Sequence, residues 1–401
     1  MAQLHLLSPK GFRAAGVSAG IKTKKNAKDV ALLVADRLSP AAAVFTTNKV
    51  FAAPVKIGRE HIVRGELRGA VVNAGNANAC TGKQGDKDAR RMCELSADLI
   101  DAKSDEFLPC STGIIGHLMP MPKVERGIRA AATALGNSRE HALAFSDAIL
   151  TTDLVRKESA IESKSGKKFR IAGVCKGSGM IGPRMTLHAT MLAFITTDAQ
   201  VPVPLLRNVL QYATERSFNA VTVDDHTSTN DTAVVIASGA SDASIESPKE
   251  INYFRDALTE VCESLAYQIA KDGEGATKVV AINVSGALNE SDARVIARAI
   301  ANSPLVKCAM HGNDPNWGRI VSAAGLAGVP FDPERCVLTL AGTVVFRAGR
   351  PVAFDPGKVS AALAAKEVVV DLDCRMGSGA ATVWTCDLSK EYVSINADYH
   401  T

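Results

Sequence analysis

The feature that most constrains the fold of this chain is the alternation of short Val- and Ile-rich runs with stretches of helical periodicity. Apolar residues recur at intervals of three and four at Met92, Leu95 and Leu99, and again from residue 251 to residue 269, as they do in amphipathic helices. The other runs are typical of buried strands, and each is bounded by Gly, Asp or Asn. They are residues 29–36, 69–75, 232–238, 278–285 and 337–346. The alternation predicts an α/β (α+β) protein built from layered sheets and helices.

Two local signals add to this pattern. Asn289, with acidic residues close behind it, predicts the start of a further helix. Residues 156–168 form the most polar interruption and are interpreted as a hairpin or loop that joins two strands. They are also a candidate domain boundary, because a chain of 401 residues is long enough for about two or three folding units.

The composition indicates a globular protein that does not bind nucleic acid. Apolar residues make up 46% of the chain, and the formal net charge of +4 is small for this length. A nucleic-acid interface would show a dense basic patch with interleaved aromatic residues. The basic cluster of Lys22, Lys24, Lys25 and Lys28 is therefore interpreted as a solvated surface loop.

Neither export nor membrane insertion is indicated. The first residues lack the basic segment and apolar core of a secretory signal, and no apolar run approaches the ~20 residues that span a bilayer. The nine cysteines are scattered and none forms a C-x-x-C pair, which fits buried thiols in a reducing compartment better than disulfides or zinc ligands. We expect a cytoplasmic protein without a metal site.

Eight short segments concentrate small and polar residues that core packing does not require. Any one of them could be a turn. Eight together indicate loops gathered round one site on a rigid scaffold. The segments are residues 73–82, 109–116, 151–153, 176–183, 217–232, 271–278, 311–319 and 394–401.

The glycine-rich segment K-G-S-G-M-I-G-P, residues 176–183, is a poor match for a nucleotide-binding loop. A P-loop has its lysine after the glycines, whereas Lys176 precedes them. Pro183 follows the last of the three glycines directly, which argues against the dinucleotide-binding fingerprint.

Thr190 stands in a strongly apolar run, L-H-A-T-M-L-A-F-I-T-T-D-A at residues 187–199, where a core strand would normally carry Val or Ile. One interpretation is a core threonine with a hydrogen-bonded hydroxyl. The other is a nucleophile: if a tight turn presses the Ala189 carbonyl against the Thr190 hydroxyl, the chain cleaves itself there. The freed α-amine of Thr190, with a reference pKa of about 7.7 to 8.0, would then serve as the base. Spacing alone leaves both interpretations open.

Taken together, these segments resemble the ornithine acetyltransferase family, also called the glutamate N-acetyltransferase family. The resemblance covers nearly the whole chain, from P-K-G-F-R-A-A-G-V at residues 9–17, through F-T-T-N at 45–48 and A-A-P-V at 52–55, to the last threonine. In that family the precursor cleaves itself before a threonine in an A-T-M-L context that follows K-G-S-G-M-I-x-P.

The resemblance therefore implies self-cleavage between Ala189 and Thr190. An α chain of residues 1–189, which carries the oxyanion hole, would separate from a β chain of residues 190–401, which begins with the nucleophile. The implied fold is the layered one of this family, with the chemistry of an N-terminal-nucleophile enzyme.

Roles for other residues follow from the same resemblance. The S-T-G segment would supply the oxyanion hole, through the hydroxyl of Thr112 and the backbone N–H of Gly113. Lys176 would bind a substrate carboxylate and Glu274 a substrate ammonium; their alternatives are a surface lysine and a turn carboxylate. The full set of implied substrate contacts is either Thr151 or Thr152, with Lys176, Thr190, Glu274, Asn396 and Thr401.

The chain departs from the family pattern in two places. Three residues are inserted before Thr190 relative to the family's spacing, which makes Thr186 a second candidate nucleophile, although the following M-L-A-F-I-T-T-D-A aligns only with Thr190. Asp225 and His226 stand where the family typically has glycine and aspartate. We expect Asp225 to take a left-handed conformation at some cost, and His226 to be an exposed loop residue rather than a titratable group near the site.

The implied function is a step of arginine biosynthesis: transfer of acetyl from N2-acetylornithine to glutamate through acetyl-Thr190. Neither a metal nor a cofactor is implied, and the family suggests a heterotetramer of two α and two β chains. Use of acetyl-CoA as a second donor is left open by the sequence. The alternatives are a self-processed threonine aminopeptidase or amidase, with water as acceptor, and a non-catalytic binding protein.

Overall fold

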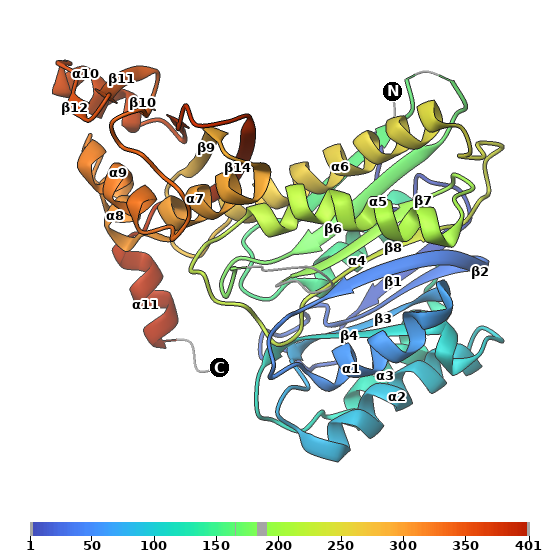
Figure 1. Cartoon of the computed structure of the whole chain (residues 1–401). Coiled ribbons are helices and arrows are strands. Elements are labelled where there is room, and N and C mark those ends of the chain that lie inside the picture. Colours follow the sequence, from blue (N-terminus) through green and yellow to red (C-terminus); the bar gives the residue numbers. More distant parts are fainter. Residues whose placement is uncertain (1–2, 165, 183–190, 399–401) are drawn as a thin grey trace.

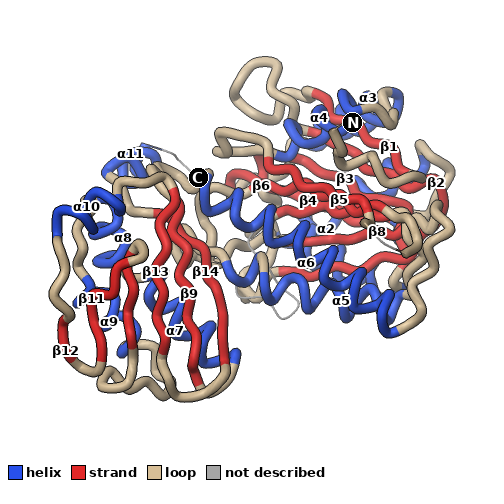
Figure 2. The backbone as a smooth tube through the Cα atoms, turned by 90° about the horizontal axis from the view of Figure 1, so that it is seen from above, coloured by secondary structure: helices blue, strands red, loops and turns tan. Residues whose placement is uncertain are grey.

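The computed structural model describes residues 3–164, 166–182 and 191–398, whose strands form two sheets (Figure 1, Figure 2). The larger sheet has the strand order β4-β3-β2-β8-β7-β6-β5, with β1 paired to β2 beside this path. Its strands are β1 (Phe12–Val17), β2 (Val30–Phe45), β3 (Glu66–Asn76), β4 (Phe107–Ile114), β5 (Lys157–Glu162), β6 (Arg170–Lys176), β7 (Leu192–Thr197) and β8 (Thr232–Ala237).

The long strand β2 joins two halves of this sheet. Its first part, residues 30–34, pairs with β3, and its last part, residues 41–45, pairs with β8. The pairing with β3 is irregular between Val34 and Ser39, where β2 passes from one half to the other. One half therefore holds β1 to β4 and the other holds β5 to β8.

Helices surround both halves of the sheet. The α-helices are α1 (Ala53–His61), α2 (Gly82–Asp98), α3 (Met121–Thr133), α4 (Arg139–Ile149), α5 (Val203–Arg216) and α6 (Pro248–Lys271). Short 3₁₀ turns are η1 (Ile62–Arg64), η2 (Ser104–Glu106) and η3 (Phe218–Ala220). Helices α5 and α6 pack on the second half, α2 and α3 pack on the first, and α4 contacts both halves.

The two halves pack face to face, because both faces of their strands are apolar. In β7, Leu192 and Phe194 belong to the core shared with β2 and β3, whereas Ala193 and Ile195 belong to the core beneath α5 and α6. Phe145 of α4 meets Phe194 edge to face, with ring centroids 5.1 Å apart. The result is four layers in the order helix, sheet, sheet, helix (Figure 1), which confirms the predicted layered α/β class.

A second sheet, with the order β12-β11-β10-β13-β9-β14, lies beside these layers (Figure 2). Its strands are β9 (Val279–Ala287), β10 (Val337–Leu340), β11 (Thr343–Arg347), β12 (Arg350–Pro351), β13 (Glu367–Asp373) and β14 (Gly379–Cys386). The accompanying helices are α7 (Glu290–Asn302), α8 (Pro304–His311), α9 (Trp317–Gly325), α10 (Pro356–Leu363) and α11 (Lys390–Asp398). Helices α7 to α10 share one core with this sheet, and α6 contacts β9 and β14.

Most of the predicted elements are confirmed, and one strand is wrong. The predicted start of α7 is correct, since the Asn289 side chain accepts a hydrogen bond from the Asp292 N–H at 2.9 Å. The predicted strand at residues 337–346 is instead the hairpin β10–β11. Ala341 and Gly342 both have positive φ, 46° and 81°, and form its two-residue turn. A β-branched run on both sides of a small-residue turn has the same composition as one long strand.

Residues 156–168 contain β5 and the connection to β6, so the hairpin interpretation is confirmed. Since β5 and β6 pair antiparallel within one sheet, no domain boundary falls there.

All nine cysteines are free thiols, and seven of them are buried. Across the described ranges no helix is long and apolar enough to cross a membrane.

Candidate active site

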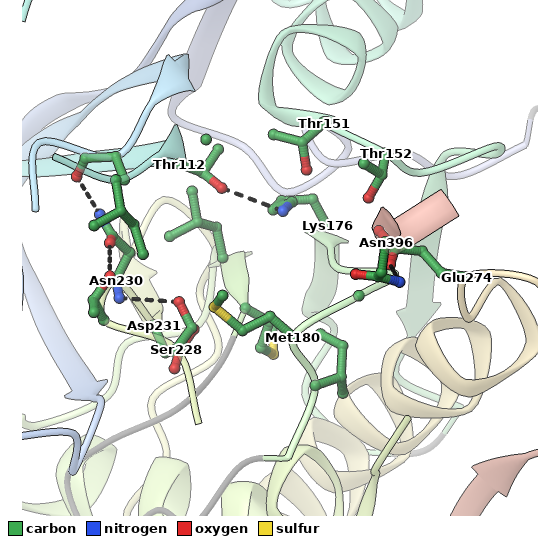
Figure 3. A pocket seen from close by; sticks show the side chains of 18 residues that line it. Thr112, Thr151, Thr152, Lys176, Met180, Ser228, Asn230, Asp231, Glu274 and Asn396 are labelled. Carbon is green, nitrogen blue, oxygen red and sulfur yellow. Dashed lines mark hydrogen bonds between the residues drawn. The ribbon is translucent and has the colours of Figure 1, made fainter. Parts of the chain in front are cut away.

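A polar pocket lies where β4 and β6 end and where β7 and β8 begin (Figure 3). The antiparallel pairing of β6 with β7 brings Lys176 opposite Leu192, and the parallel pairing of β7 with β8 brings Leu192 opposite Thr232. The polar lining consists of Thr112, Thr151, Thr152, Lys176, Ser228, Thr229, Asn230, Asp231, Glu274 and Asn396.

Seven of the eight polar segments contribute to this pocket, as predicted. The eighth, residues 311–319, does not line it. That segment ends α8 and begins α9: His311 pairs with Asp387 at 2.7 Å, and Asn313 accepts a hydrogen bond from Lys278 Nζ at 2.5 Å. The composition of residues 311–319 indicates a polar loop. It does not indicate where the loop lies, because that position depends on how the strands and helices are arranged.

Thr112 and Gly113 lie at the end of β4, and the backbone conformation at position 113 requires glycine. Gly113 has a φ of +128°, and a Cβ there would lie 2.4 Å from the carbonyl carbon of Gly75. Lys176 Nζ donates a hydrogen bond to Thr112 Oγ1 at 3.2 Å (Figure 3). Because this bond uses a lone pair of the oxygen, the Thr112 proton can be donated to a ligand in the pocket.

Lys176 is buried at the end of β6, with 9% of its surface exposed, so the alternative of a surface lysine is wrong. Burial lowers the pKa of the Lys176 ammonium, and the nearby carboxylate of Asp153 acts in the opposite direction. A cation this deeply buried is a strong partner for a carboxylate.

Glu274 and Asn396 come together from distant parts of the chain. Asn396 Nδ2 donates to Glu274 Oε2 at 2.9 Å, so α11 brings the end of the described chain back to the pocket (Figure 3). Glu274 packs against the backbone of Gly179, where an added Cβ would lie 2.2 Å from its Oε2. Thr151 and Thr152 both line the pocket, so both remain candidates for substrate contact.

A group of buried charges that the sequence analysis did not identify lies behind Lys176. Lys157 Nζ donates to Asp153 Oδ1 at 2.7 Å and to Asp272 Oδ2 at 2.5 Å. Burial alone would raise the pKa of Asp153, but Lys176, Lys157 and the Gly177 N–H lower it to about 2. Asp153 and Asp272 lie in segments already singled out for their polarity, whereas Lys157 gave no signal beyond a charge at the start of a polar loop.

Asn230 was also missed, although its segment was identified. Its Nδ2 donates to the carbonyl of Ala77 at 2.5 Å and to that of Ser111 at 2.9 Å, and its Oδ1 accepts from Thr229 Oγ1. All of these groups are buried, so Asn230 ties the start of β8 to β4 and to the loop after β3.

The loop at residues 224–226 supports the glycine-rich segment. The carboxylate of Asp224 accepts hydrogen bonds from the N–H groups of Met180 and Ile181, at 2.8 and 2.9 Å. Asp225 has a φ of 57°, which confirms the expected left-handed conformation, and His226 is exposed as expected. The departures from the family pattern therefore leave this support in place.

Four residues named from the sequence, Thr186, Ala189, Thr190 and Thr401, lie outside the described residues. The described residue that follows Thr190 is Met191, and it lines the pocket together with Leu192. Within the described ranges, no group of three or more His, Cys, Asp and Glu side chains could hold a metal ion.

A four-layered α/β fold whose buried lysine, carboxylates, hydroxyls and amides converge on one pocket defines an enzyme that acts on a small polar molecule. The model of the ArgJ family matches residues 13–401 of the chain. The chain belongs to the ArgJ family, and the family predicted from the sequence is thereby confirmed.

Similar proteins extend over the same length. The chain is 46% identical to the arginine biosynthesis bifunctional protein ArgJ of Rhodopirellula baltica, over 99% of this chain and 97% of that protein. It is 47% identical to the protein of the same name from Symbiobacterium thermophilum, over 98% of each. A crystal structure of the ArgJ protein of Bacillus halodurans has 41% identity and a TM-score of 0.51; the match covers 52% of this chain and 100% of that chain.

Proposed function

We propose that this enzyme transfers an acetyl group from N2-acetylornithine to glutamate, and so acts in arginine biosynthesis. Membership of the ArgJ family, and similarity over nearly the whole chain to proteins named arginine biosynthesis bifunctional protein ArgJ, support this reaction. The observation that carries the proposal is the pocket itself: seven polar segments, spread over most of the sequence, converge on Lys176, Thr112 and Glu274.

The reaction would run in two half-reactions. The hydroxyl of Thr190 attacks the acetyl carbonyl of N2-acetylornithine, the α-amine of Thr190 takes the hydroxyl proton and delivers it to the leaving amine, and ornithine departs. The amine of glutamate then attacks the acetyl ester, and N-acetylglutamate leaves with Thr190 restored. Thr112 and Gly113 would donate hydrogen bonds to the oxyanion in each half, each worth roughly 10²- to 10³-fold in rate.

Both substrates are α-amino acid derivatives, and the charges of the pocket suit them. Lys176 would bind the carboxylate and Glu274 the ammonium, with Thr151 or Thr152, Asn396 and Thr401 completing the contacts. The buried position of Lys176 and the Glu274–Asn396 hydrogen bond support these roles.

Self-cleavage between Ala189 and Thr190 would create the nucleophile and divide the chain into residues 1–189 and 190–401. Two observations support it. The solved Bacillus halodurans chain corresponds over its whole length to 52% of this chain, about the size of one fragment. In addition, β6 and β7 lie on either side of the cleavage point and pair along their length, so the fragments would stay together after the cut.

We further propose a cytoplasmic location and an assembly of two copies of each fragment, with no metal or cofactor. Light scattering of the purified protein tests the assembly: a mass of about twice that of the full chain supports it, and the mass of one chain contradicts it. Acetyl-CoA as a second acetyl donor is tested by incubating it with glutamate alone.

The central experiment separates this function from its alternatives. The purified protein is incubated with N2-acetylornithine, with and without glutamate, and the products are identified by mass spectrometry. N-acetylglutamate formed only with glutamate supports the proposal, whereas acetate released without glutamate indicates an amidase. N-terminal sequencing of the smaller fragments then distinguishes Thr190 from Thr186, and an intact, unacylated chain would favour a binding protein.

A further inference from the structure

Lys157 is a fully buried charge near the pocket, and no role above has been assigned to it. Its side chain and that of Asp153 are fully inaccessible to solvent, and that of Asp272 is 5% exposed. Lys157 Nζ contacts both carboxylates, at 2.7 and 2.5 Å. A buried ammonium is tolerated only with such partners, because burial removes its hydration.

The same two carboxylates also bind the backbone of two segments that line the pocket, residues 151–154 and residues 176–178. Asp153 accepts hydrogen bonds from the N–H groups of Gly177 and Thr151, at 2.7 and 3.0 Å. Asp272 accepts one from the Leu154 N–H at 3.1 Å, and its backbone carbonyl accepts one from Ser178 Oγ at 2.6 Å. Lys157 therefore links the segments at 151–154, 176–178 and 272–274 through one ammonium group.

The two positive and two negative charges of this cluster balance, and the availability of the Lys176 ammonium depends on that balance. Lys157 and Lys176 carry two positive charges, and Asp153 and Asp272 carry two negative ones. Asp153 interacts electrostatically with both lysines. If Lys157 were uncharged, Asp153 would lose the cation bonded to it and would attract the Lys176 ammonium more strongly, which would make that ammonium less available to a ligand in the pocket.

We propose that Lys157 is a positioning residue for substrate binding: by neutralising Asp153 and Asp272, it leaves the ammonium of Lys176 available to the substrate carboxylate and fixes the three loops around it. This inference rests on the proposed function, because the substrate carboxylate is that of glutamate or N2-acetylornithine. Lys157 itself does not line the pocket, so it acts through Lys176 and the loops.

The test compares Lys157→Met with the double variant Lys157→Met/Asp153→Asn. In the single variant Asp153 competes with substrate for Lys176, and KM for glutamate should rise about tenfold or more, with a smaller change in kcat per acetylatable site. In the double variant the competing charge of Asp153 is gone, and the amide oxygen of Asn can still accept a hydrogen bond from Gly177. KM should therefore return to within about threefold of the wild-type value.

If the role of Lys157 is purely structural, KM of the double variant should be no lower than KM of the single variant, because the double variant loses two buried polar partners. If the single variant does not fold, the double variant decides alone: a KM close to wild type supports the inference, and a tenfold rise overturns it. Lys307→Met is the matched control. Lys307 is also buried, with 5% of its surface exposed, but it bonds to Thr385 and to the Cys386 carbonyl, so its loss should lower stability without raising KM.

The two proposals fail in distinguishable ways. If the wild-type protein makes no N-acetylglutamate, the proposed function is wrong and the inference falls with it. If the wild-type protein is active and KM of Lys157→Met is unchanged, only the inference about Lys157 is wrong.

Discussion

Replacing Thr112 with valine tests the oxyanion role with little disturbance of the fold, because valine has nearly the same shape and lacks only the hydroxyl. In the folded protein this hydroxyl accepts one hydrogen bond, from Lys176 Nζ at 3.2 Å, which is at the long end of the normal range. The substitution therefore removes one weak structural bond and, if the role is correct, one donor to the transition state.

The two losses differ in size and can be separated. Losing a long hydrogen bond of this kind should cost about 1 to 2 kcal/mol of folding free energy, which leaves a protein of ordinary stability folded. Losing an oxyanion donor should lower kcat by roughly 10²- to 10³-fold, equivalent to about 2.7 to 4 kcal/mol. KM should change little, since the donor acts on a charge that develops only in the transition state.

Initial rates of N-acetylglutamate formation give kcat and KM, and titration of the acetylated enzyme corrects for inactive protein. Thr112→Ser keeps a hydroxyl and should retain most of the activity, while thermal unfolding reports the stability of both variants. A Thr112→Val enzyme with kcat within about fivefold of wild type would contradict the oxyanion assignment, because a true donor is worth far more than that.

Three further predictions follow from single positions. Thr190→Ala should give one uncut, inactive polypeptide, visible by denaturing electrophoresis and mass spectrometry; a cut or active variant would refute the nucleophile assignment. Gly113→Ala should lower Tm and kcat together, since its Cβ would overlap the Gly75 carbonyl carbon at 2.4 Å and its φ of +128° disfavours any side chain; an unchanged Tm would show that β3 and β4 adjust. Burial lowers the pKa of Lys22 to about 8 from 10.5, so between these values the unfolded chain binds more protons and the folded state gains stability as pH rises. Denaturant unfolding of Lys22→Met across that interval should show a smaller rise than wild type, and an equal rise would exclude Lys22 as its source.

Lys22 also shows why the basic cluster was only partly understood from the sequence. Lys24 and Lys25 are exposed, as the prediction of a solvated loop requires. Lys22 instead donates to the carbonyls of Lys28 and Ala148, at 2.5 and 3.3 Å. Ala148 is 126 positions further along the chain, and no local pattern relates the two residues.

The position of the pocket was predictable to a useful degree. Loops rich in small and polar residues are expensive to bury without partners, so a chain that carries eight of them must place them at a surface or a site. The resemblance to a family then assigned Thr112, Lys176 and Glu274 to one site, and the fold brings these three residues together. The resemblance did not assign Asn230. The partners of this residue, the Ala77 and Ser111 carbonyls, become its neighbours only in the folded sheet.

The sequence by itself determined the local structure, because strand and helix periodicity and the Asn289 cap depend on residues within a few positions of one another. It also determined the family, through short motifs in a fixed order. The structure also showed that residues 337–346 turn back on themselves at Ala341 and Gly342. Only the tertiary structure decided that residues 311–319 lie away from the pocket and that Lys157 meets Asp272 across 115 positions of sequence. The physical reason is that burial and charge compensation are properties of neighbours in space, and for these residues the neighbours come from distant strands and loops.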